Sequence, residues 1–167
     1  MDFVMILGMS VQAFTLLHVV ISLVAIASGL IAILALAGNK LSGLTALFLI
    51  TTALTSITGF LFPIHGVTPG IVLGVLSMIV LLPAAIALYG GKLAGGWRGT
   101  YIICAALALW FNVFVLFAQI FAKVPALKAI APTQSSPAFG ATQLVVLVVF
   151  IVLTIRAFKG FRGPAHA

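Results

Sequence analysis

The chain has 167 residues, of which 64% are hydrophobic and only 5% are charged. A soluble domain carries about 25% charged residues, so this composition excludes a water-soluble fold and predicts a membrane protein. The formal net charge of +7 resides on Lys and Arg side chains between or at the ends of apolar runs, which predicts contacts with lipid headgroups and not with nucleic acid.

Five apolar runs are each long enough to cross a bilayer core, which requires about 20 helical residues. The first predicted helix ends at Gly38-Asn39, a typical helix stop, and residues 3–12 before it are expected to lie at the interface or to extend the helix. The chain is therefore predicted to form one integral membrane domain over residues 1–167. Its fold class is an all-α bundle of five transmembrane helices, at residues 13–37, 43–62, 68–89, 98–122 and 139–158.

The connections 38–42, 63–67 and 90–97 are short, so consecutive helices are expected to be antiparallel neighbours. The longer connection, 123–138, is predicted to begin with one or two interfacial helical turns. Pro83 lies inside the third run and is expected to kink that helix, because it removes one backbone hydrogen bond.

The distribution of basic residues predicts the orientation in the membrane. With five spans, one side carries only Lys123 and Lys128. The other side carries six: Lys40, Lys92, Arg98, Arg156, Lys159 and Arg162. Since Lys and Arg are enriched in cytoplasmic segments, we expect the C-terminus in the cytoplasm and the N-terminus outside.

Helices in lipid associate through small residues and hydrogen bonds. Small residues recur at helical spacing in the first three runs, and we expect Gly29, Gly59, Gly70 and Gly74 to lie at helix contacts. The Gly70–Gly74 pair forms a GxxxG element.

Strongly polar side chains collect toward the outer ends of the predicted helices, and they are costly to place in hydrocarbon. One hypothesis is a polar pocket that opens outward. Its residues are His18, Ser22, His65, Asn112, Gln119 and Gln143. The alternative is that these side chains only form hydrogen bonds between helices, as Asn and Gln often do in membranes.

These residues leave three functional hypotheses. Asp2 is the only carboxylate side chain, so proton relays and two-carboxylate hydrolysis lack their groups. A non-enzymatic accessory component with no cofactor, which binds lipid, another membrane protein or a second copy of itself, is therefore the first hypothesis. The second is a redox protein that binds haem or a transition metal through His18 and His65. The third is an oligomeric transporter or channel for small solutes.

The stretch from Gly95-Gly96-Trp97-Arg98 through Trp110-Phe111-Asn112 to Lys123-Val124-Pro125 and Pro132-Thr133-Gln134 resembles a family of small hypothetical inner-membrane proteins of bacteria. The resemblance covers roughly residues 95–150, about a third of the chain. It implies a bacterial inner membrane as the location, and it implies no activity.

Overall fold

The computed structural model describes residues 5–63, 66 and 68–163. Helices dominate this part of the chain, in agreement with the predicted all-α class. They are α1 (Val11–Ala37), α2 (Thr45–Phe60), α3 (Pro69–Ala85), a π-helix (Ile86–Gly90) that continues α3, α4 (Gly96–Lys123), α5 (Pro125–Ile130) and α6 (Pro137–Gly160). Two short antiparallel strands, β1 (Met5–Ile6) and β2 (Met9–Ser10), precede α1.

Four helical stretches are long and apolar enough to cross a membrane, so the chain has the character of an integral membrane protein. They are α1 with 27 residues, α3 and its π extension with 22, α4 with 28 and α6 with 24. Their ends lie within two residues of the predicted ends. Helix α2 has 16 residues, about 24 Å at 1.5 Å per residue, which is shorter than a typical bilayer core. A fifth span therefore stays a prediction.

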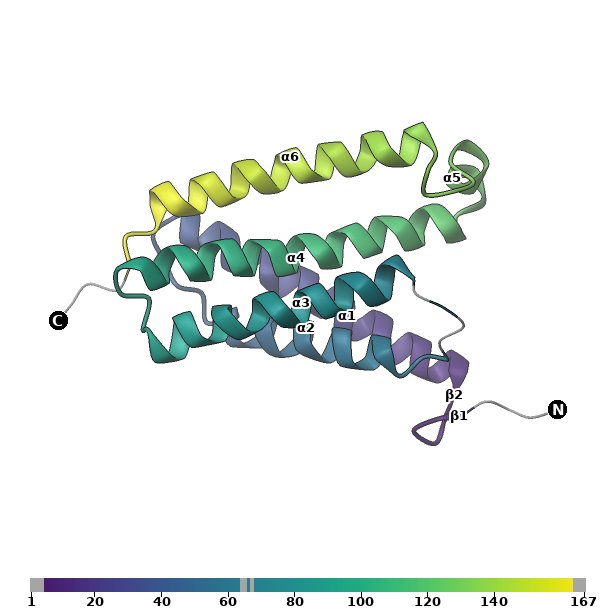
Figure 1. Cartoon of the computed structure of the whole chain (residues 1–167), viewed down its shortest axis with the longest axis horizontal. Coiled ribbons are helices and arrows are strands. Elements are labelled where there is room, and N and C mark those ends of the chain that lie inside the picture. The colour runs from purple at the N-terminus through teal and green to yellow at the C-terminus, as the bar shows by residue number, and fades with distance from the viewer. Residues whose placement is uncertain (1–4, 64–65, 67, 164–167) are drawn as a thin grey trace.

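The long helices lie side by side along one axis (Figure 1). Helix α4 is central, because it packs on α1, α3 and α6, while α2 lies against α1 and α3. The core between them contains the fully buried side chains of Phe48, Tyr101, Ile102 and Leu109. As expected from the short connections, α1, α2, α3, α4 and α6 alternate in direction along the chain.

Local sequence explains where the helices begin and end. The Ser10 hydroxyl accepts a hydrogen bond from the Ala13 amide at 3.2 Å, and the Thr68 hydroxyl accepts one from the Ile71 amide at 3.3 Å. Both satisfy amides that lack a partner in the first helical turn. At the other end of α1, Asn39 adopts a φ of 58°, the left-handed conformation that terminates many helices.

The segment before α1 forms a tight hairpin. Leu7 and Gly8 have φ values of 52° and 77°, as a two-residue turn of type I′ requires, and Met5 pairs with Ser10. Of the two alternatives for residues 3–12, an extension of the first helix is wrong for residues 5–10, because the hairpin turn reverses the chain before Val11, and it is correct for residues 11 and 12, which begin α1. Residues 3 and 4 lie outside the described residues.

Pro83 and the long connection between α4 and α6 are the two other irregular features of the sequence. Pro83 lies inside α3, and the π-helix begins three residues after it, with the Gly91 amide donating to the Ile86 carbonyl at 2.8 Å. A π turn accommodates a disturbed hydrogen-bond ladder without ending the helix. Helix α5 confirms the predicted helical turns in the long connection, and none of its side chains is buried.

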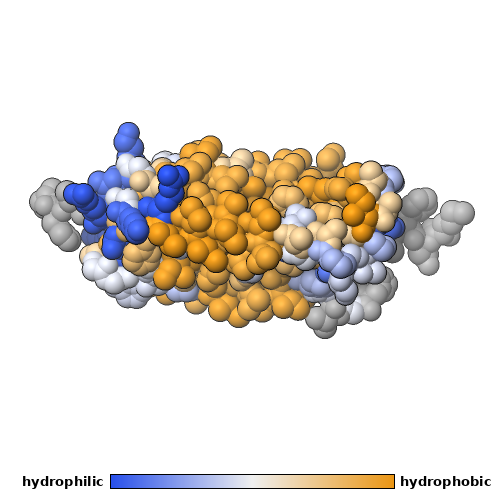
Figure 2. Space-filling model, turned by 90° about the horizontal axis from the view of Figure 1, so that it is seen from above, coloured by the Kyte–Doolittle hydropathy of each residue, from blue (hydrophilic) through white to orange (hydrophobic). Residues whose placement is uncertain are grey.

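The surface has an apolar middle and hydrophilic ends. Figure 2 shows a broad hydrophobic band across the middle of one face, with the most hydrophilic residues gathered at the end where α6 terminates. This pattern is typical of helices that are surrounded by lipid along most of their length.

Candidate functional site

The best-defined polar contact of the predicted pocket involves His18 on α1. Its Nδ1 lies 2.7 Å from the hydroxyl of Thr58 on α2. The Thr58 hydroxyl donates its own proton to the Leu54 carbonyl at 2.7 Å, so it can only accept from the histidine. Neutral His18 therefore carries its proton on Nδ1, and its Nε2 bears the lone pair.

The His18 ring contacts an aromatic side chain and faces a glycine. The Phe62 ring meets the imidazole edge to face, with the two centroids 5.4 Å apart. A Cβ added at Gly59 would lie 3.6 Å from His18 Cε1, an ordinary contact distance. Ser22, one turn further along α1, donates to the backbone carbonyl of His18 at 2.7 Å and so bonds within its own helix.

Asn112 lies in the middle of the bundle, where it is buried. Its Nδ2 donates to the hydroxyl of Thr52 on α2 at 3.3 Å, and the Thr52 side chain is fully enclosed. This bond ties α4 to α2 across the core. Sequence reasoning singled out Asn112 but not its partner, because Thr52 is one of several threonines on α2.

Gln143 and Gln119 have different environments. Gln143 is buried, and its Nε2 donates to the carbonyl of Phe114 on α4 at 3.1 Å, while its Oε1 is enclosed with no partner among the described residues. Gln119 is exposed near the end of α4. His18, Asn112 and Gln143 thus bond across three different helix pairs, α1–α2, α2–α4 and α4–α6, and Gln119 lies at the surface.

His65, the remaining pocket residue and the second predicted haem or metal ligand, lies outside the described residues. Within residues 5–63, 66 and 68–163, the side chains of His, Cys, Asp and Glu form no group of three that could hold a metal ion.

Three of the four predicted packing glycines lie at helix contacts. A Cβ at Gly29 would come within 2.7 Å of Leu109 and Phe48, and one at Gly74 would come within 2.8 Å of Phe60. Gly59 faces His18, as described above. Gly70 is exposed, and a Cβ there would meet only the nearby Thr68 side chain.

The sequence interpretation missed the role of Arg98. Its Nη1 donates to the backbone carbonyls of Phe158, at 3.1 Å, and Phe161, and its guanidinium lies over the Phe158 ring, 5.2 Å from the centroid. Carbonyls at the end of a helix lack intrahelical donors, so Arg98 satisfies the end of α6. No local signal predicts this contact, because about 60 residues separate the partners.

The end of α6 is also fastened to α1. The backbone amide of Arg162 donates to Asn39 Oδ1 at 2.9 Å, and Gly160 lies so close to Ala37 that a Cβ would overlap its backbone. These contacts bring together the ends of α1 and α6 and the start of α4. We call this region the basic end, defined by the six residues Lys40, Lys92, Arg98, Arg156, Lys159 and Arg162.

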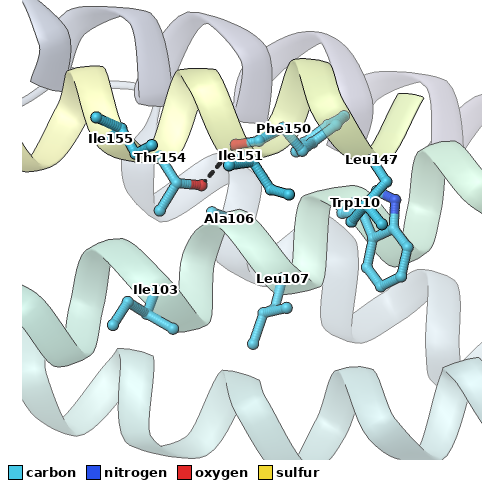
Figure 3. Close-up of a pocket in the computed structure, with 9 residues that line it drawn as sticks. All are labelled: Ile103, Ala106, Leu107, Trp110, Leu147, Phe150, Ile151, Thr154 and Ile155. Atoms are coloured by element: carbon cyan, nitrogen blue, oxygen red, sulfur yellow. Dashed lines mark hydrogen bonds between the residues drawn. The ribbon is translucent and has the colours of Figure 1, made fainter. Parts of the chain in front are cut away.

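A groove of about 240 Å³ lies between α4 and α6 (Figure 3). One wall is the Ile103, Leu107 and Trp110 face of α4, and the other is the Leu147, Ile151 and Ile155 face of α6. Thr154 also lines the groove, but its hydroxyl donates to the Phe150 carbonyl at 2.7 Å. The groove is thus an apolar surface that neither sequence periodicity nor composition indicated.

Comparison of the chain with protein-family models, with curated proteins and with solved structures gives no match.

Proposed function

We propose that the chain is a non-enzymatic component of a bacterial inner membrane that acts by binding lipid or another membrane protein. The observation that supports this most is the engagement of its buried amides by other helices, above all Asn112 with Thr52. Such contacts stabilise a helix bundle in a membrane.

The small number of acidic and thiol side chains also supports a non-enzymatic role. The chain contains one acidic side chain and one cysteine, and the cysteine, Cys104, lies on α4 among apolar residues. The surface of the long helices is instead rich in exposed aliphatic side chains, such as Leu16, Ile79 and Val145. An apolar surface of this kind binds acyl chains or the helices of a partner.

The proposed topology has five spans, namely the four long helices and α2. Although α2 is short, Leu44 and Leu61 flank it and extend its apolar length, and it lies alongside α1 and α3. An odd number of spans puts the chain ends on opposite sides. The excess of Lys and Arg then puts the basic end in the cytoplasm.

The topology is testable with single cysteines in a Cys104→Ala background. Ser135→Cys and Leu61→Cys are expected to react with a membrane-impermeant thiol reagent in intact spheroplasts, and Ser42→Cys only after lysis. Equal labelling of Leu61→Cys and Ser42→Cys would contradict a crossing by α2.

A second candidate, a haem or metal protein, is favoured by one observation. Because Thr58 holds the Nδ1 proton of His18, Nε2 is the nitrogen that can donate an electron pair to iron or another metal. Absorption spectra and metal analysis of the detergent-purified protein, beside a His18→Ala variant, distinguish the two candidates. A Soret band or stoichiometric metal that disappears in the variant would replace the first proposal.

A further inference from the structure

The groove between α4 and α6 begins close to the basic end. Ile155 and Thr154 immediately precede Arg156 in the chain, and Ile103 follows Arg98 by five residues, about 7.5 Å along a helix. The hollow therefore begins in the apolar band just inside a cluster of cations.

We call the end of the groove nearest the basic end its mouth, and α4 and α6 are in contact there. Phe158 of α6 lies against Gly99 of α4, where a Cβ would come within 2.9 Å of its ring. The Arg98 guanidinium lies over the same ring, 5.2 Å from its centroid. The two helices are thus joined at the basic end, and the groove opens toward the lipid between exposed Ile103, Ile151 and Ile155.

The charge around this mouth is of one sign. The six residues of the basic end come from the α1–α2 connection, the α3–α4 connection, α4, α6 and the segment just after α6. None of the described residues has a carboxylate side chain. Cations beside a membrane attract anionic lipid headgroups, and arginine binds phosphate particularly well. An apolar groove that leads to such a cluster matches a molecule with a phosphate at one end and a hydrocarbon chain at the other.

We infer that the α4–α6 groove binds one acyl chain of an anionic phospholipid, whose phosphate contacts the basic end. This inference rests on the proposed membrane location and names the lipid class and its place. Arg156 and Lys159 on α6 are exposed and are available to a headgroup, while Arg98 keeps the groove mouth together through its bonds to α6.

Trp110 makes the inference directly measurable, because it lines the far part of the groove and is one of only two tryptophans. A Trp97→Phe variant leaves Trp110 as the single indole. The protein is reconstituted into phosphatidylcholine vesicles that contain a small, fixed fraction of phosphatidylglycerol. In one set of vesicles the phosphatidylglycerol carries bromine on its acyl chains. In the other set the phosphatidylglycerol is unbrominated, and an equal fraction of the phosphatidylcholine carries bromine.

We expect brominated phosphatidylglycerol to quench Trp110 several-fold more strongly than an equal fraction of brominated phosphatidylcholine does. Cations near the membrane surface attract anionic lipid, so Arg156→Gln with Lys159→Gln is expected to abolish most of the difference. The matched control, Lys123→Gln with Lys128→Gln at the opposite end, is expected to retain it. A preference that survives the first pair, or disappears with the second, would overturn the assignment of the headgroup to the basic end.

A second pair of variants tests the groove itself. Ile151→Phe places a larger ring in the groove wall, and Val149→Phe places the same ring at an exposed position outside the lining. We expect only the first to reduce the preferential quenching.

The remaining outcomes separate this inference from the proposed function. Equal quenching by both brominated lipids would place the protein in the bilayer but refute the lipid site. Protection of Trp110 from both would indicate that a second copy fills the groove, which also refutes it. A protein that does not enter the vesicles at all would instead refute the membrane location.

Discussion

Gly160 is the position where the packing of α6 on α1 leaves no room for a side chain. A Cβ there would overlap the carbonyl oxygen and carbon of Ala37 and lie within 2.9 Å of its Cα. These are backbone atoms, so no rotamer change relieves the overlap. Gly160→Ala must push apart the ends of the two helices, beside the buried side chains of Ala157 and Phe161.

The magnitude follows from two opposing terms. Overpacking of this kind costs about 1–3 kcal/mol. Replacing a helical glycine with alanine returns about 0.5–1 kcal/mol, because alanine loses less backbone entropy on folding. We therefore expect a net loss of about 0–2.5 kcal/mol in the free energy of unfolding.

A matched control isolates the clash. Gly140 lies on the same helix, and a Cβ there would meet nothing within 4 Å. Gly140→Ala is expected to stabilise α6 by about 0.5–1 kcal/mol, so the difference between the two variants equals the overlap cost of about 1–3 kcal/mol. The assay is SDS titration in mixed detergent micelles, with unfolding followed by far-UV circular dichroism. Equal unfolding free energies for the two variants would refute the close backbone contact.

Three other predictions concern the polar side chains. In the same titration, Asn112→Leu is expected to lower the free energy of unfolding by about 0.6–1.7 kcal/mol, because it removes the hydrogen bond to α2. Cys104→Ala is expected to lower it less. Wild-type stability of both variants would contradict the buried bond. Gln143→Met is expected to leave the free energy of unfolding unchanged or to raise it by up to about 1 kcal/mol, because it removes an enclosed oxygen that has no partner among the described residues. A loss as large as that of Asn112→Leu would contradict this and show that the Gln143 amide stabilises the bundle. In alkaline buffer, nitrogen NMR is expected to find the His18 proton on Nδ1, and Thr58→Val is expected to shift the tautomer population; a proton on Nε2 in the unmodified protein would contradict the geometry.

The four long helices and their ends could be predicted from sequence, because both depend on local properties. The fifth predicted span corresponds to α2, which has only 16 residues. Runs of apolar residues set the helix lengths, and Ser10, Thr68 and Asn39 mark ends through hydrogen bonds or backbone conformations within a few residues. The hairpin at residues 5–10 was not predicted, because Leu7 is an unusual residue for a left-handed turn position.

The contacts between helices depended on the tertiary structure. The long helices are apolar on all sides, so their periodicity does not indicate which face meets which neighbour. The pairing of Asn112 with Thr52 and the fold-back of Arg98 onto α6 each join residues about 60 positions apart. The same holds for the α4–α6 groove, since a hollow between two helices exists only once their separation and rotation are fixed. Sequence thus determined which segments form helices in a membrane, because that depends on local transfer into lipid, whereas only close packing decided which side chains meet.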